Sequence, residues 1–225
     1  MLHVESEIQE LKDRLIAMWD LVIKQLDKTQ QALEGHDRDL ALEIQATERR
    51  INAFELTIDL SCEDFIALLQ PVASDLRFEL TALEINTNLE RIGDIACGIS
   101  EFISDHDTEF NREIIKHMEA DRMLTLSIEM VKNLREAYLL ENTAKARTVY
   151  KRDRMLDKIN SVASFRAVDC LEKYPDQKRQ TLHVLSMIRK IERIGDQAKN
   201  IAEEIIFYIE AKVIKHKRKE KDKEE

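Results

Sequence analysis

The chain has 225 residues, of which 35% are charged, but it contains only 4 Gly and 2 Pro. So few chain-breaking residues leave room for a small number of long helices and argue against a sheet fold with its many turns. The net charge of −9 argues against a nucleic-acid-binding surface. Because the sequence shows neither a signal peptide nor a membrane span of roughly 18 apolar residues, we expect a soluble, cytoplasmic protein that is at most peripheral to a membrane.

The first half of the chain predicts three amphipathic helices. Apolar residues recur every three, four or seven positions over residues 3–34, and Gly35 ends this first helix. A second helix begins after Asp37, a suitable N-cap, and runs to about residue 70, where Pro71 stops it. The third covers residues 73–104 with a 4-3-4-3 apolar seam that is typical of a helix in a bundle.

The same three-helix pattern returns after the polar stretch 105–108. Helices are predicted over residues 109–140, 142–173 and 177–214, with Pro175 breaking the chain before the last of them. The segment 215–225 is almost entirely charged, so we expect it to be disordered. The predicted fold is therefore all-α, with six long helices in two similar three-helix bundles over residues 1–105 and 106–214.

One motif occurs twice and supports this duplication. Residues 89–94 read Leu-Glu-Arg-Ile-Gly-Asp and residues 191–196 read Ile-Glu-Arg-Ile-Gly-Asp, so Glu90 and Glu192 are 102 residues apart. A repeat at this distance indicates two copies of one structural unit. The glycine of each copy, Gly93 or Gly195, permits either a close helix contact or the close approach of a bound group.

Each copy of the motif places two carboxylates on one helix face. Glu90 with Asp94, and Glu192 with Asp196, are four residues apart. At 100° per residue they lie roughly 130–170° from the middle of the apolar seam. We therefore expect these four carboxylates to face outward rather than into a core.

The second helix of each half supplies a matching pair. Glu48 and Asn52 in the first half correspond to Asp153 and Asp157 in the second. If the second and third helices of a bundle lie antiparallel, each half presents two such pairs on one surface. Oxygen-rich groups of this kind suit hard or borderline cations such as magnesium, manganese, iron or zinc. The candidate metal ligands are Glu48, Asn52, Glu90 and Asp94 in the first half, and Asp153, Asp157, Glu192 and Asp196 in the second.

The acidic pairs are also compatible with two different kinds of protein. With 44 acidic residues, chance gives roughly eight pairs at this spacing, so the protein is alternatively a helical scaffold with solvated charges. A carboxylate-bridged di-metal enzyme would need inward-facing Glu-x-x-His pairs, and none of the six histidines has a Glu three residues before it. Like charges at this spacing are mildly unfavourable on an exposed helix, and their recurrence in both copies favours a cation site. No catalytic residue is predicted.

Taken together, these motifs resemble those of the PhoU family of phosphate-signalling proteins. The resemblance rests on the two motif copies, the acidic pairs before them, and the segments Gln-Pro-Val-Ala-Ser-Asp-Leu-Arg at 70–77 and Asn-Ile-Ala-Glu-Glu at 200–204. It implies two three-helix bundles, with metal ions or multinuclear clusters bound by the acidic pairs. Asn52 departs from the acidic pattern, so the resemblance implies a weaker first cluster.

The resemblance also implies a function and partners. It implies a negative regulator of phosphate uptake and of the phosphate-starvation response. Such a regulator contacts a membrane sensor histidine kinase and the phosphate ABC transporter, and it has no enzymatic activity of its own. A homodimer is a further expectation from the family, although the sequence indicates no interface for it.

Overall fold

The first three helices form one bundle, as the sequence predicts. The computed structural model describes residues 2–106 and 108–213, and its first helices are α1 (Leu2–Gly35), α2 (Arg38–Leu69) and α3 (Ser74–Ser104). Asp37 caps α2 by accepting a hydrogen bond from the Leu40 amide at 2.9 Å. The helix ends just before Pro71, where Gln70 adopts a left-handed conformation with φ 46°.

The second bundle contains two breaks that the sequence pattern does not predict. The expected helix over 109–140 is divided into α4 (Arg112–Met118) and α5 (Ala120–Leu139), because Glu119 between them has φ 59°. The expected helix over 142–173 is divided into α6 (Thr143–Arg147) and α7 (Val149–Lys173). At this second break the Thr148 amide and hydroxyl both bond the Lys145 carbonyl, which tightens the chain into a turn.

The last helix is preceded by one short turn. This 3₁₀ turn, η1 (Pro175–Gln177), leads into α8 (Lys178–Glu210), which Ala211 caps in a left-handed conformation, so the helix is shorter than the predicted 177–214. The segment 215–225, for which disorder is predicted, lies outside the described residues. No described residue belongs to a β-strand, so the all-α fold with two similar bundles is confirmed.

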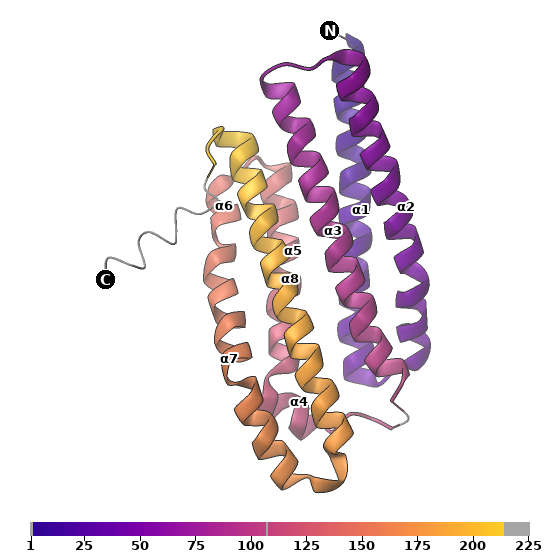
Figure 1. The fold of residues 1–225 in the computed structure, drawn as a ribbon, viewed down its shortest axis with the longest axis vertical. Helices are drawn as coiled ribbons and strands as arrows, with labels where there is room; N and C mark the ends of the chain where they lie inside the picture. The colour runs from indigo at the N-terminus through magenta and orange to yellow at the C-terminus, as the bar shows by residue number, and fades with distance from the viewer. Residues whose placement is uncertain (1, 107, 214–225) are drawn as a thin grey trace, which may run out of the picture.

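The two bundles lie side by side along antiparallel helices. Figure 1 shows α1, α2 and α3 on one side, α5, α7 and α8 on the other, and α3 beside α8 at the centre. The indole of Trp19 in α1 donates a hydrogen bond to the carbonyl of Val131 in α5 at 3.2 Å. The ion pair between Asp20 and Arg135 at 2.7 Å also joins these two helices. Buried residues of both bundles form one continuous hydrophobic core.

An approximate two-fold axis relates the bundles. The Asn200 amide donates to the Asn88 side-chain oxygen at 3.1 Å, and the Lys190 ammonium lies 2.5 Å from where a Cβ on Gly98 would stand. Residues 88 and 190, like residues 98 and 200, are 102 positions apart, which is the spacing of the repeated motif. These two contacts are therefore the same contact seen from each copy, and the sequence repeat is also a structural repeat.

Candidate functional site

In the first bundle, α2 and α3 cross at Gly93. A Cβ on this glycine would lie 2.9 Å from the Ile51 Cδ1 and 3.3 Å from the Glu48 Oε2. The missing side chain therefore lets the two helices pack closely and brings the Glu48 carboxylate against the backbone of α3. Close helix packing thus accounts for this motif glycine, and the same contact positions a predicted ligand.

The second bundle repeats this arrangement between α7 and α8. A Cβ on Gly195 would lie 2.6 Å from the Leu156 Cδ1 and 3.3 Å from the Asp153 Oδ1. Leu156 and Asp153 each follow their first-half counterparts, Ile51 and Glu48, by 105 residues. Each bundle thus has one acidic cluster along the contact between its last two long helices.

Burial and the charge of neighbouring carboxylates raise the pKa of Glu48 and of Glu90 in the first cluster. Burial raises the pKa of Glu48, and repulsion from Asp94 and Glu55 adds to this, while a hydrogen bond from the Gln25 amide at 3.0 Å partly offsets it. Burial also raises the pKa of Glu90 to about 7, with further contributions from Glu55, Asp94 and Glu48. Such overlapping negative fields favour either a proton or a bound cation.

Glu55 is a member of the first cluster that the sequence analysis missed. It lies seven residues after Glu48, two helical turns along the same face of α2, and its own pKa is raised by burial and by Asp59. Its counterpart in the second half is Asn160, so comparing the two copies concealed it. The heptad spacing from Glu48 was the available signal.

The two copies have exchanged one acid and one amide. The first has Asn52 and Glu55 where the second has Asp157 and Asn160, so each cluster contains four carboxylates. Asn52 is exposed, and with its amide nitrogen turned toward Glu48 it donates to Oε1 at 2.9 Å. In this orientation Asn52 supports a neighbouring carboxylate by hydrogen bonding.

The four motif carboxylates are accessible, in line with the predicted outward orientation. Asp94 is exposed, and Glu90, Glu192 and Asp196 are half-buried along the helix contacts. Asp153 on α7 differs, because only 5% of it is exposed. The site is therefore a pair of shallow acidic surfaces, and the second has one carboxylate, that of Asp153, buried between the helices.

The second cluster contains a cation of its own. The Lys199 ammonium lies 3.0 Å from the Asp153 Oδ2 and 2.8 Å from the Asp196 Oδ1. Burial alone would lower the pKa of Lys199, but its hydrogen bonds to these two carboxylates outweigh burial and raise the pKa. The pKa of Glu192 is raised, first by burial and then by Asp196 and Asp157.

The first cluster lacks this lysine, although the nearby Arg91 partly offsets the raised pKa of Glu90 and of Glu55. The position that matches Lys199 is Cys97, and burial, reinforced by Glu48 and Glu101, raises the pKa of its thiol to about 11. This thiol is neutral near pH 7, so it does not balance the acidic charge. The first cluster therefore has the larger net negative charge of the two.

The side chains are not closed around a metal position. Within residues 2–106 and 108–213, no group of three or more His, Cys, Asp and Glu side chains is arranged so that it could hold a metal ion. The donor chemistry nevertheless suits a hard cation, since the first cluster offers carboxylate oxygens with excess negative charge. Cation binding would require these carboxylates to rotate toward a common point.

Comparison with known proteins identifies the family. The model of the PhoU domain matches this chain twice, over residues 15–103 and 120–205. The chain belongs to the PhoU family. Each PhoU domain contains one copy of the Glu-Arg-Ile-Gly-Asp motif and one acidic cluster, so the family's domain unit coincides with the repeat found in the sequence.

Named relatives match this PhoU chain over most of its length. The phosphate-specific transport system accessory protein PhoU homolog of Clostridium acetobutylicum is 31% identical over 93% of this chain and 95% of its own. The crystal structure of PhoU from Pseudomonas aeruginosa superposes with a TM-score of 0.86 at 28% identity, covering 92% of this chain and 99% of that one. The phosphate transport system regulatory protein PhoU from Streptococcus pneumoniae gives a TM-score of 0.82 at 25% identity, with coverage of 94% and 99%.

The helices of this PhoU chain do not have the character of membrane spans. Across the part of the chain that the structure describes, no helix is both long enough and apolar enough to cross a bilayer. The long helices α1 and α8 instead have one apolar face in the core and one charged face. Their length therefore reflects bundle packing.

Proposed function

We propose that this protein is a negative regulator of phosphate uptake and of phosphate-starvation signalling. In this proposal it acts in the cytoplasm, between the phosphate ABC transporter and a membrane sensor histidine kinase. Support comes from its membership of the PhoU family and from the names of its relatives as accessory and regulatory proteins of phosphate transport. The proposal assigns the protein no catalytic residue.

Deletion of the gene tests this role directly. A strain without the protein should express phosphate-starvation genes in phosphate-rich medium and accumulate phosphate, and the intact gene supplied in trans should reverse both effects. A reporter for starvation transcription and an assay of cellular phosphate measure them. If neither quantity changes on deletion, the protein is not a regulator of phosphate uptake.

We further propose that the acidic clusters bind divalent or transition metal ions, namely magnesium, manganese, iron or zinc. In the first cluster the carboxylates of Glu48, Glu55, Glu90 and Asp94 would hold the ion, because their mutual repulsion is relieved by a cation. In the second cluster the ligands would be Asp153, Asp157, Glu192 and Asp196, but a metal ion must first displace the Lys199 ammonium. The first cluster is therefore expected to bind more tightly, despite Asn52.

Metal analysis separates this proposal from a plain helical scaffold. Purified protein equilibrated with manganese should retain the ion, and Glu90→Gln with Asp94→Asn should remove most of it. Glu192→Gln with Asp196→Asn is the matched control in the second copy and should remove less. Equal metal content in all three proteins would favour the scaffold without a functional metal.

The di-metal enzyme remains the least supported alternative. Both clusters consist of surface carboxylates, and neither includes a histidine. The ligand set of a bundle-core oxidase, with Glu-x-x-His pairs pointing inward, is therefore missing from these two sites. A homodimer is retained as a proposal, and size-exclusion chromatography with light scattering tests it.

A further inference from the structure

The two copies differ most clearly where α4 ends and α5 begins. In the first copy α1 runs without interruption through Arg14, the counterpart of Glu119. In the second copy Glu119 adopts φ 59° and breaks the helix. A left-handed conformation is unfavourable for a residue with a Cβ, so surrounding contacts must hold it in place.

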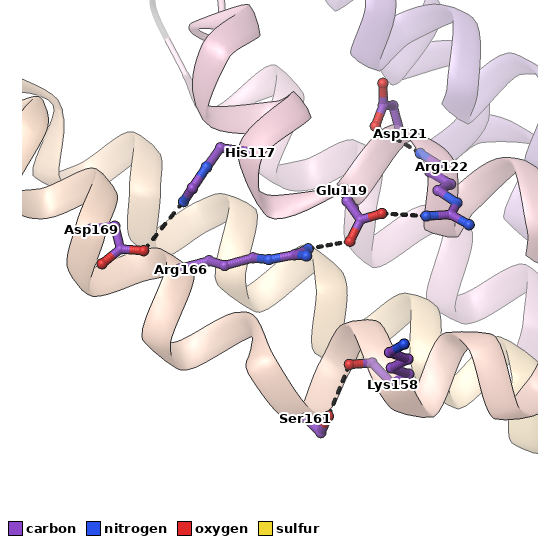
Figure 2. A network of polar contacts seen from close by, with 8 residues as sticks. All are labelled: His117, Glu119, Asp121, Arg122, Lys158, Ser161, Arg166 and Asp169. Carbon is purple, nitrogen blue, oxygen red and sulfur yellow. Dashed lines mark hydrogen bonds and ion pairs between the residues drawn. The ribbon is translucent and has the colours of Figure 1, made fainter.

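Two arginines bind the Glu119 side chain, one on each carboxylate oxygen, and the Glu119 amide donates to the Lys116 carbonyl. Arg166 of α7 binds Oε2, and Arg122 of α5 binds Oε1, as Figure 2 shows. The hydrogen bond from Arg166, followed by that from Arg122, holds the pKa of Glu119 below its usual range. The carboxylate is therefore ionised and occupies the position between two guanidinium groups.

These residues line a surface hollow of about 460 Å³, which we call the basic hollow. Lys158 joins the two arginines in its wall and forms no ion pair with another described residue. Three cations therefore face one carboxylate in a protein whose net charge is −9. The complete lining is Glu119, Arg122, Met155, Lys158, Ile159, Val162 and Arg166.

The first copy carries different side chains at the matching positions. There Arg14 donates to the Ser61 hydroxyl and pairs with Glu10. Ser61 is the counterpart of Arg166, and Ala53 is the counterpart of Lys158. Because the first copy packs without cations at these two positions, the packing of a three-helix bundle does not require Lys158 or Arg166.

The chemistry of the basic hollow limits what it binds. Guanidinium groups recognise oxyanions through paired hydrogen bonds, but here a ligand must compete with a tethered carboxylate. A dianion of higher charge density than a single carboxylate competes better for the guanidinium groups. A phosphoryl group is such a dianion near neutral pH. The volume lies within the range of small-molecule sites, and the apolar side chains offer a wall for a non-polar group.

We propose that the basic hollow binds a small phosphoryl dianion, inorganic phosphate or a phosphate monoester, which displaces the Glu119 carboxylate from Arg122 and Arg166. No residue of the hollow belongs to the second acidic cluster, although α7 contributes to both. The proposal is independent of metal binding at the clusters and of the regulatory role. Release of Glu119 would also remove the ion pairs with Arg122 and Arg166 at the break between α4 and α5.

Nuclear magnetic resonance of the full chain tests this site. The Nε–H signals of Arg122 and Arg166 should shift on titration with inorganic phosphate, whereas sodium chloride at matched ionic strength should leave them in place. Equal shifts with chloride would overturn the proposal, because they would indicate screening alone. Phenyl phosphate is titrated in parallel: tighter binding than inorganic phosphate assigns the ligand to monoesters, and weaker or equal binding assigns it to the free anion. Both of these results support the site.

Three variants are expected to differ in their affinity for phosphate. Arg166→Gln should weaken phosphate binding by about tenfold or more, since it removes a charge-assisted hydrogen bond. Glu119→Gln should strengthen binding by a similar factor of about ten, because the competing carboxylate is gone. Arg154→Gln, an exposed residue of the same helix outside the hollow, is the control of equal charge and should leave affinity unchanged.

The Glu119 variant distinguishes the site from general electrostatic attraction. Glu119→Gly also removes the carboxylate and suits the left-handed backbone, so it serves if Glu119→Gln unfolds, as checked by circular dichroism. Tighter phosphate binding in either folded variant supports the proposal. Affinity that is unchanged in both, or that falls equally in Arg166→Gln and Arg154→Gln, overturns it.

Discussion

Glu79 gives the clearest quantitative prediction of this structure. Its side chain in α3 is fully buried, and in the described structure neither carboxylate oxygen has a hydrogen-bond partner within normal distance. Burial raises its pKa from 4.5 to about 7, although the nearby Cys62 thiol offsets this in part. The folded protein therefore keeps the proton to higher pH than the unfolded chain, so this residue lowers stability as pH rises through the interval between the two values.

The size of the effect follows from the two pKa values. Between pH 5 and pH 8, ionisation of Glu79 should cost about 2.5 kcal/mol of unfolding free energy. Glu79→Gln cannot ionise, so its stability relative to wild type should increase by about this amount over the same interval. Any constant cost of burying the amide cancels in this comparison.

Urea unfolding at the two pH values measures the effect. The single tryptophan, Trp19, is fully buried and reports unfolding by its fluorescence. Glu84→Gln, at an exposed position of the same helix, is the control and should show no such pH-dependent gain. If the difference between wild type and Glu79→Gln is the same at both pH values, then Glu79 does not titrate in this range and the reasoning fails.

Three further predictions concern the helix contacts and the two clusters. Gly195→Ala places a Cβ 2.6 Å from a leucine methyl of α7, so urea unfolding should show a loss of about 1–3 kcal/mol. Lys199→Met leaves the buried Asp153 without its cation, so stability near pH 7 should fall by about 2–3 kcal/mol, and added manganese should restore part of it. Protonation of Glu90, whose pKa is about 7, competes with cation binding, so calorimetry should show the manganese affinity of the first cluster rising about tenfold between pH 6 and pH 8.

Each of these predictions has its own control. Gly35→Ala is the match for Gly195→Ala, because a Cβ at residue 35 meets nothing within 4 Å, and an equal loss in both variants would contradict the packing argument. Lys199→Met without loss of stability would mean that Asp153 needs no cation. Manganese affinity that does not depend on pH in wild type, or that keeps its pH dependence in Glu90→Gln, would remove Glu90 from the site.

Much of the fold follows from the sequence because the helices are long and amphipathic. The predicted helices over 3–34 and 73–104 agree closely with α1 and α3, since a run of some thirty residues with one apolar face has few alternatives. The breaks at Glu119 and Thr148 were not predictable in this way. The Glu119 side chain pairs with Arg166, which is distant in sequence. Across Thr148 the buried residues Ala146 and Val149 keep a helical spacing.

The candidate site was only partly predictable for a related reason. The repeated motif identified the acidic pairs, and the helix contacts at Gly93 and Gly195 place the second-helix carboxylates beside them. Glu55 was missed because the copies differ at this position. Lys199 was missed because a lysine near acidic residues is common on solvated helices. Glu79 gave no signal, since a glutamate is seldom fully buried without a partner.

A single comparison in cells tests the claim that joins the two proposals, namely that the protein represses the phosphate-starvation response and needs the carboxylates of its first acidic cluster to do so. A strain lacking the gene is supplied with wild type or with the Glu90→Gln, Asp94→Asn variant, and a phosphate-starvation reporter is measured in phosphate-rich medium. Wild type should repress the reporter, and the variant, present at the same level and folded, should leave it expressed. Full repression by the variant would contradict the claim.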